Sequence, residues 1–169
     1  MKTEVIRSNR RKKTVQARVV DGKLRIHIPA YFDAATEAYW VAEMTDRLQR
    51  TRASGQVDLE ARAATLARTY QLRTPAHITW SSRQRTLWGS CTPERATVRI
   101  SDRVAAFPAW VIDYVIVHEL AHLDEPSHSA PFWALVDRYP KSERARGYLL
   151  AKAEQLDGID EEPKATVSR

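Results

Sequence analysis

The chain has 169 residues, of which 43% are hydrophobic and 28% charged, values ordinary for a single globular domain. Its one cysteine excludes an internal disulfide framework, and no stretch approaches the roughly 18 apolar residues that a membrane span requires. The basic N-terminus also lacks the apolar core of a secretory signal, so we expect a cytoplasmic protein with no membrane partner.

The spacing of apolar residues predicts an α+β fold with the element order β-β-α-α-β-β-α-α-α. Two alternating segments flank Asp21-Gly22, a dipeptide that favours a tight hairpin turn, and Asp33 is expected to cap the first helix. We predict strands over residues 14–20, 23–29, 77–82 and 97–101, an extended segment or turn over 88–91, and helices over 33–52, 58–72, 110–123, 130–139 and 143–156.

These elements predict one domain over residues 1–157. It would consist of an N-terminal β-hairpin region over residues 1–30 and a core of helices packed on a small sheet over residues 31–157. Residues 158–169 contain acidic residues and Pro163, and this composition predicts a disordered C-terminal tail.

The most informative segment is His118-Glu119-Leu120-Ala121-His122, an HExxH motif. It lies in a run that is apolar nearly all round and is expected to form a buried helix, in which two histidines four residues apart share one face. Both imidazoles could reach one Zn²⁺, and the metal would offset the cost of burying polar groups. Glu119 could then accept a proton from a zinc-activated water, which is the chemistry of a peptidase. Co²⁺, Ni²⁺ or Mn²⁺ would also suit nitrogen ligands.

His128 is the expected third ligand. Pro126 should end the helix and allow the chain to turn back toward the metal. Three protein ligands leave a fourth position open, and this open position distinguishes a catalytic zinc from a structural one. His128 could instead be a surface residue near the start of the next helix, in which case the replacement ligand would be a carboxylate from Glu125, Asp137 or Glu143.

Trp88-Gly89-Ser90 is the candidate substrate-binding segment, because a peptide can extend an exposed sheet edge and glycine permits close backbone approach. Alternatively, Trp88 belongs to the core and Gly89 forms a bulge. Spacing does not distinguish an oxyanion donor among Arg85, Tyr114, Tyr139 and Tyr148. Cys91 could block the metal as a thiolate, but a lone cysteine in an apolar strand is usually inert packing.

The histidine spacing equals that of the metzincins, but Glu125 stands where their motif has glycine and no methionine follows the site. The chain instead resembles the YgjP-like family of predicted zinc metallopeptidases, whose core is similar to that of SprT-like and WLM proteases. The residues that carry this resemblance are Trp88-Gly89-Ser90-Cys91, the segment 111–123, and His128-Ser129 followed by Phe132-Trp133; Arg10-Arg11-Lys12-Lys13, Asp21-Gly22 and residues 26–29 extend it upstream.

The resemblance covers most of residues 5–155. It implies a minimal zincin-like metallopeptidase core with the HExxH motif on its active-site helix. It also implies one Zn²⁺ per chain, bound by His118, His122 and His128, with Glu119 as the catalytic base. The implied partner is a protein or peptide substrate.

The net charge of +6 includes a basic cluster near the N-terminus, formed by Arg7, Arg10, Arg11, Lys12 and Lys13. These cations could contact the phosphates of a nucleic acid, but no known nucleic-acid-binding signature accompanies them. A solvated hairpin edge guarded by cations is the favoured explanation. We therefore expect a zinc peptidase; the alternative is a non-hydrolytic, zinc-stabilised binding module associated with nucleic acid. Glu119 separates the two, because a structural site needs a fourth ligand rather than a base.

Overall fold

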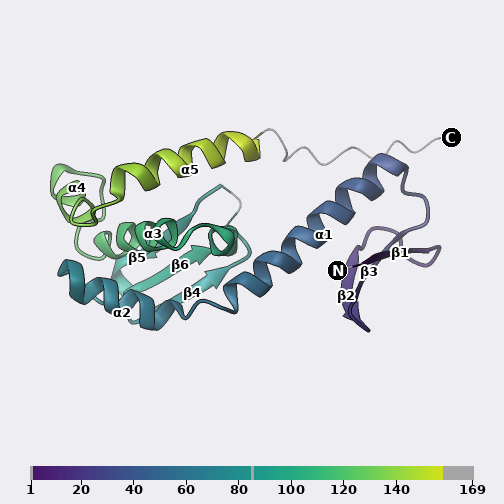
Figure 1. The fold of residues 1–169 in the computed structure, drawn as a ribbon, viewed down its shortest axis with the longest axis horizontal. Helices are drawn as coiled ribbons and strands as arrows, with labels where there is room; N and C mark the ends of the chain where they lie inside the picture. Colours follow the sequence, from purple (N-terminus) through teal and green to yellow (C-terminus); the bar gives the residue numbers. More distant parts are fainter. Residues whose placement is uncertain (1, 85, 158–169) are drawn as a thin grey trace. The chain divides into compact units, whose positions relative to one another are not determined.

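The computed structural model describes residues 2–84 and 86–157, so the tail predicted over residues 158–169 lies outside the described residues. The internal contacts group the chain into two compact units, one over residues up to 49 and the other over residues 50–157 (Figure 1). The organisation as one domain, with a division after residue 30, stays a prediction. None of the described helices is both long enough and apolar enough to cross a bilayer.

The first unit contains a three-stranded sheet. Its strands are β1 (Thr3–Ser8), β2 (Gln16–Val20) and β3 (Lys23–Pro29), in the order β1-β3-β2, with β1 parallel and β2 antiparallel to β3. Asp21 and Gly22 join β2 to β3 with φ angles of 50° and 72°, as a type I′ turn requires. The predicted hairpin is confirmed. Strand β1 was not predicted, because its partner β3 lies about 20 residues further along the chain.

Helix α1 (Ala34–Ser54) packs on one face of this sheet within the first unit. Leu24, Ile26 and Ile28 alternate along β3, and all three are buried in an apolar cluster that also contains Met44 of α1. The Asp33 carboxylate accepts a hydrogen bond from the Thr36 N–H at 2.8 Å, which confirms the predicted cap.

The second unit is built on another three-stranded sheet, which is covered by helices. Strands β4 (His77–Ser81), β5 (Gly89–Thr92) and β6 (Thr97–Ser101) have the order β4-β6-β5, with β4 parallel and β5 antiparallel to β6. The helices are α2 (Leu59–Tyr70), α3 (Ala109–Ala121), α4 (Ala130–Val136) and α5 (Ser142–Asp157), with short 3₁₀ turns η1 (Pro93–Arg95) and η2 (Asp102–Ala106). This arrangement is the predicted α+β fold.

Helix α3 lies at the centre of this unit, along the sheet and against α2, α4 and α5 (Figure 1). Its apolar side chains are buried nearly all round, as its sequence predicts. The helix ends at Ala121, five residues before Pro126, rather than running to residue 123. The reason is a tightening of the last turn, in which the Leu123 N–H bonds to the Leu120 carbonyl and the Asp124 N–H to the Ala121 carbonyl.

Candidate active site

His118 and His122 lie on one face at the C-terminal end of α3. The His122 N–H still bonds to the His118 carbonyl at 3.3 Å, so the early end of the helix leaves the two residues one turn apart. Their ring centroids are 5.0 Å apart. This is the relation that the HExxH spacing predicts.

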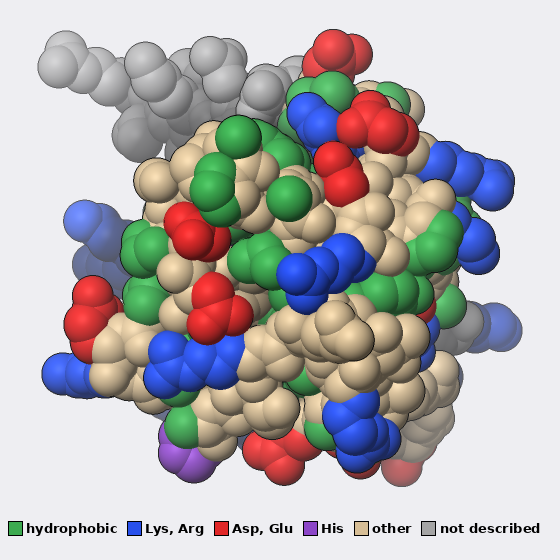
Figure 2. Space-filling model, turned by 90° about the vertical axis from the view of Figure 1, so that its left-hand side faces the viewer, with side chains coloured by type: hydrophobic (Ala, Val, Ile, Leu, Met, Phe, Trp, Pro, Cys, Tyr) green, Lys and Arg blue, Asp and Glu red, His purple; other side chains and the backbone are tan. Residues whose placement is uncertain are grey.

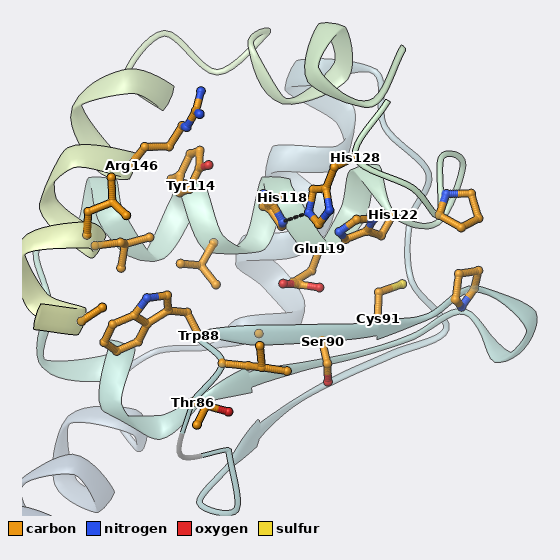
Figure 3. A pocket seen from close by; sticks show the side chains of 18 residues that line it. Thr86, Trp88, Ser90, Cys91, Tyr114, His118, Glu119, His122, His128 and Arg146 are labelled. Atoms are coloured by element: carbon orange, nitrogen blue, oxygen red, sulfur yellow. Dashed lines mark hydrogen bonds between the residues drawn. The ribbon is translucent and has the colours of Figure 1, made fainter. Parts of the chain in front are cut away.

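His128 comes from the loop between α3 and α4, and its ring joins the other two. Its Nε2 lies 3.2 Å from Nε2 of His118, and one ring nitrogen from each of the three histidines falls within 4.8 Å of the others (Figure 3). Two nitrogens bound to one tetrahedral zinc at about 2.0–2.1 Å each are about 3.3 Å apart. The spacing of the cluster therefore suits a single metal ion. Glu125, Asp137 and Glu143 contribute no atom to it.

Burial favours the neutral form of His118 and His122, the form in which an imidazole binds a metal. Burial, with repulsion from His122 and His128, lowers the pKa of His118 to about 3, and burial also lowers the pKa of His122. Nδ1 of His122 lies 3.1 Å from the Glu125 carbonyl oxygen, which fixes the ring and leaves Nε2 as the candidate ligand atom. Nδ1 of His118 is buried without a hydrogen-bond partner among the described residues.

Two aromatic residues of α4 hold these rings in place. The Phe132 ring stacks on His122 with centroids 4.3 Å apart, and the Trp133 ring stacks on His128 at 5.6 Å. Phe132 is fully buried, whereas His128 is exposed. The Ser129 hydroxyl accepts a hydrogen bond from the Phe132 N–H at 3.4 Å and caps the helix that carries both aromatic rings.

Glu119 projects from α3 toward β5 and is only 6% exposed. Burial raises the pKa of this carboxyl to about 8. A cation held by the neighbouring histidines would favour the ionised form. The backbone of β5 approaches the carboxyl so closely that a Cβ on Gly89 would lie 2.6 Å from Oε1 and 2.7 Å from Cγ of Glu119. Gly89 thus makes room for the Glu119 side chain itself.

The cluster opens into a pocket of about 640 Å³ (Figure 3). Trp88 and Gly89 line it from β5 and the loop before it. Trp88 also packs edge-on against Phe107, with ring centroids 5.4 Å apart, so it is both a wall of the pocket and part of the core. Ser90 lines the pocket too, but its side chain points away from Glu119, and its hydroxyl accepts a hydrogen bond from the Gln84 amide at 2.7 Å. We therefore expect Ser90 to contribute through its backbone.

Of the three tyrosines considered as oxyanion donors, all within the described part of the chain, only one lines the pocket. Tyr114 lines it, and its hydroxyl has no hydrogen-bond partner among the described residues. Burial raises the pKa of Tyr114 to about 12, so the hydroxyl keeps its proton at neutral pH. The Tyr139 hydroxyl donates to the Trp110 carbonyl at 2.9 Å, and Tyr148 packs against the rings of Phe107 and Trp110. Arg85 lies outside the described residues.

Cys91 also lines the pocket but is not part of the histidine cluster. Burial, reinforced by the Glu119 charge, raises the pKa of this thiol to about 11. The side chain is therefore a neutral thiol at neutral pH, in agreement with the packing role that its setting in the sequence favours.

The sequence prediction missed the wall that α5 contributes to the pocket. Arg146, Leu149, Leu150 and Ala153 line it, and their spacing of three, one and three residues places them on one helix face. Leu150 is 66% exposed, and Leu87, which also lines the pocket, is 57% exposed. The regular spacing on α5 was readable in the sequence, but nothing there indicated that this face meets the histidines.

Comparisons with known proteins place the chain in a metallopeptidase family. The family model described as YgjP-like, metallopeptidase domain, matches residues 10–152. Among solved structures, the metallopeptidase zymogen abylysin of Pyrococcus abyssi is similar in fold, with a TM-score of 0.51 and 17% identity over 57% of this chain and 96% of that one. The zymogen jannalysin of Methanocaldococcus jannaschii gives a TM-score of 0.48 and 16% identity over 57% and 97% of the two chains. No curated protein matches this chain.

Proposed function

We propose, from the premise that this chain belongs to the YgjP-like family of metallopeptidases, that it cleaves peptide bonds with one zinc ion and with Glu119 as the general base. The observation that carries the proposal is the buried Glu119 carboxyl beside three converging imidazoles, at the wall of an open pocket. The substrate is a protein or peptide.

His118, His122 and His128 would hold the metal, since their imidazole nitrogens and mutual spacing fit zinc. When bound, a divalent ion polarises a carbonyl group and lowers the pKa of water. The described residues add no fourth donor to the group. A structural zinc site normally closes with a fourth protein ligand, so this arrangement favours catalysis over a purely structural binding module.

Glu119 would take a proton from the attacking water and deliver it to the leaving amine. Tyr114, which lines the same pocket, would stabilise the tetrahedral intermediate. Its free hydroxyl can donate a hydrogen bond to the oxyanion that forms from the substrate carbonyl. Both side chains project from α3, a helix buried along most of its length, so their relative position is well defined.

Strand β5 is the candidate docking edge for an extended peptide. It pairs only with β6 among the described strands. The Ser101 N–H bonds to the Trp88 carbonyl at 2.9 Å, and hydrogen-bonded pairs alternate along an antiparallel ladder. The backbone groups of Gly89 and Cys91 therefore face the free edge, where a substrate strand could pair with them beside Glu119.

The pocket wall indicates which side chains the enzyme accepts. Leu87 and Leu150, the two large apolar side chains that the second unit exposes among its described residues, both line this pocket. Trp88 and Leu149 add further apolar surface to the lining of the same pocket. We infer a preference for substrates with an apolar side chain next to the cleaved bond, because its transfer to this wall removes apolar surface from water.

The test is peptide hydrolysis by the metal-loaded protein and by Glu119→Gln, with casein and a peptide library as substrates. The substituted protein should keep one metal ion per chain, measured by elemental analysis, and lose activity by about 10²–10⁴-fold. Asp124→Asn, which neutralises an exposed carboxylate near the site, is the matched control and should remain active. Equal turnover by wild type and Glu119→Gln would refute the assigned role.

A further inference from the structure

The positive charge of the protein is concentrated in the first sheet and its loops. Residues 2–29 contain nine Lys or Arg and two Asp or Glu, a net charge of +7, whereas the whole chain carries +6, so the other residues together carry −1. On the face drawn in Figure 2, by contrast, basic and acidic side chains are interspersed and neither sign prevails. The excess of positive charge in residues 2–29 therefore indicates a function of the first sheet and its loops.

The connection between β1 and β2 folds into a concave surface of about 760 Å³. Four consecutive cations line it, Arg10-Arg11-Lys12-Lys13, together with Ser8, Thr14 and His27. His27 belongs to β3, which is the central strand of its sheet. The loop cations therefore share a concave surface with a residue of the central strand. Protection of an exposed edge, which the sequence favoured as their role, does not explain this position.

Hydrogen bonds fix the conformation of the β1–β2 loop, and most of its positive charges remain free to bind a ligand. Arg11 donates to Oε1 of Gln16 at 2.9 Å and to the Thr14 hydroxyl at 3.3 Å. The Tyr31 hydroxyl donates to the Lys12 carbonyl at 2.6 Å. No described carboxylate forms an ion pair with residues 10–13, whereas Arg7 is paired with Glu37 on α1. The surface is thus organised before any ligand arrives.

The same charge continues along the sheet. Lys23, Arg25 and His27 alternate with the buried residues of β3, so they lie on the face opposite the apolar core. Arg18 of β2 is the register partner of Arg25 and shares this face. Glu4 offsets one of these charges through an ion pair with Arg25 at 2.9 Å.

We propose that this surface, the cationic sheet face formed by residues 10–13 with Arg18, Lys23 and His27, binds the phosphate backbone of duplex DNA. Arginine, lysine and hydroxyl donors are the groups that contact phosphates, and the loop supplies all three kinds. A lipid surface would require more exposed apolar side chains than Val19 and Tyr31, the two large ones that the described part of the first unit offers. Single-stranded nucleic acid would require a platform of several stacking aromatic rings, whereas only Tyr31 is exposed here.

The loop sets the expected salt dependence. The four loop cations alone, if they neutralise four phosphates, contribute a slope of about −3.6 to a plot of log affinity against log salt concentration, and any contact by Arg18 or Lys23 makes the slope steeper. Affinity should then fall about 100-fold between roughly 50 and 200 mM salt. Binding should show no sequence preference, because phosphate contacts by themselves carry no base information.

The experiment is fluorescence anisotropy with a labelled duplex of about 20 base pairs and the full-length, metal-loaded protein. The triple variant Arg10→Gln, Lys12→Gln, Lys13→Gln removes three exposed cations. Arg83→Gln, Arg95→Gln, Lys141→Gln removes three exposed cations of the second unit, so both variants have the same net charge. The first should bind at least 10-fold more weakly, with a slope reduced by about 3, while the second stays close to wild type.

Absence of binding at about 50 mM salt, or equal losses in the two triple variants, would overturn the proposal. Binding of poly-glutamate or of phosphatidylserine vesicles as tight as that of the duplex would also overturn it. Circular dichroism verifies that both variants are folded. Peptide hydrolysis should be unchanged in both, because neither variant alters a residue that lines the histidine pocket.

Discussion

Replacement of Gly89 by alanine tests whether β5 positions the carboxyl of Glu119, the proposed general base. The added methyl carbon would lie 2.6 Å from Oε1, 2.7 Å from Cγ and 2.8 Å from Cδ of Glu119. Ordinary contacts between such atoms are about 3.5–4.0 Å long, so an overlap of about 1 Å must be relieved. The Glu119 side chain is the flexible partner, and its carboxylate should therefore move by a similar distance.

A displacement of about 1 Å at a reacting group can reduce the rate about 10²-fold, which corresponds to about 2.7 kcal/mol of transition-state stabilisation. Overpacking of this kind also costs about 1–3 kcal/mol of folding free energy, a fall in Tm of several degrees. The three atoms nearest to the added methyl all belong to Glu119, and none belongs to a histidine. We therefore expect Gly89→Ala to keep its metal and to lose activity mainly in kcat.

Activity is measured with a fluorogenic peptide at saturating metal, and metal content by elemental analysis. Gly147→Ala is the matched control, because a Cβ there meets open space and alanine is the better helix former. It should keep wild-type activity. In the Glu119→Gln background, Gly89→Ala should cause little further loss of turnover, since both act on the same side chain. A folded Gly89→Ala protein with wild-type kcat would refute the reasoning.

Three further predictions concern the pocket. Tyr114→Phe should lower kcat by about 10²–10³-fold and leave the metal content unchanged, because it removes the proposed oxyanion donor. A wild-type kcat for this variant in steady-state assays would show that Tyr114 has only a structural role. Leu150→Asp should lower kcat/KM about 10-fold for peptides with an apolar residue beside the cleaved bond, and less for peptides with a polar residue there. Leu150→Met is the control and should leave kcat/KM unchanged for both kinds of peptide. If profiling with a peptide library shows equal losses for apolar and polar peptides, the inferred preference is wrong. Finally, because burial lowers the pKa of His118 to about 3, the unfolded metal-free chain binds a proton below pH 6.5 that the folded chain does not. The contribution of His118 to the stability of the EDTA-treated protein should then fall by at most about 1.4 kcal/mol per pH unit as the pH drops below 6.5. Glu119, whose pKa burial raises to about 8, contributes with the opposite sign, so the measured quantity is the difference in unfolding free energy between wild type and His118→Asn, which calorimetry should show to decrease as the pH drops below 6.5.

Several features of the molecule could be predicted because they depend on neighbours in the chain. The Asp21-Gly22 turn follows from two adjacent residues that tolerate positive φ, and both adopt it. The relation of His118 to His122 follows from helical spacing alone, and the rings lie 5.0 Å apart as that spacing requires. The capping role of Asp33 is equally local, since its carboxylate reaches an N–H three residues away.

Other features depend on segments that are distant in the sequence. Strand β1 pairs with β3 across a loop that no local pattern reveals. Arg146 and Leu150 reach the histidine pocket only because α5 packs against α3. The basic loop and His27 line one concave surface for the same reason, because their proximity follows from the fold of the β1–β2 connection.

The sequence by itself determined that a helix with the HExxH spacing would be buried and would offer two imidazoles and a carboxyl on that helix. Only the tertiary structure decided where that carboxyl rests, because the contact between Glu119 and Gly89 joins residues thirty positions apart. Side-chain periodicity depends on backbone geometry within one element, whereas the approach of β5 to α3 depends on how two elements pack, and that information is spread over the whole core.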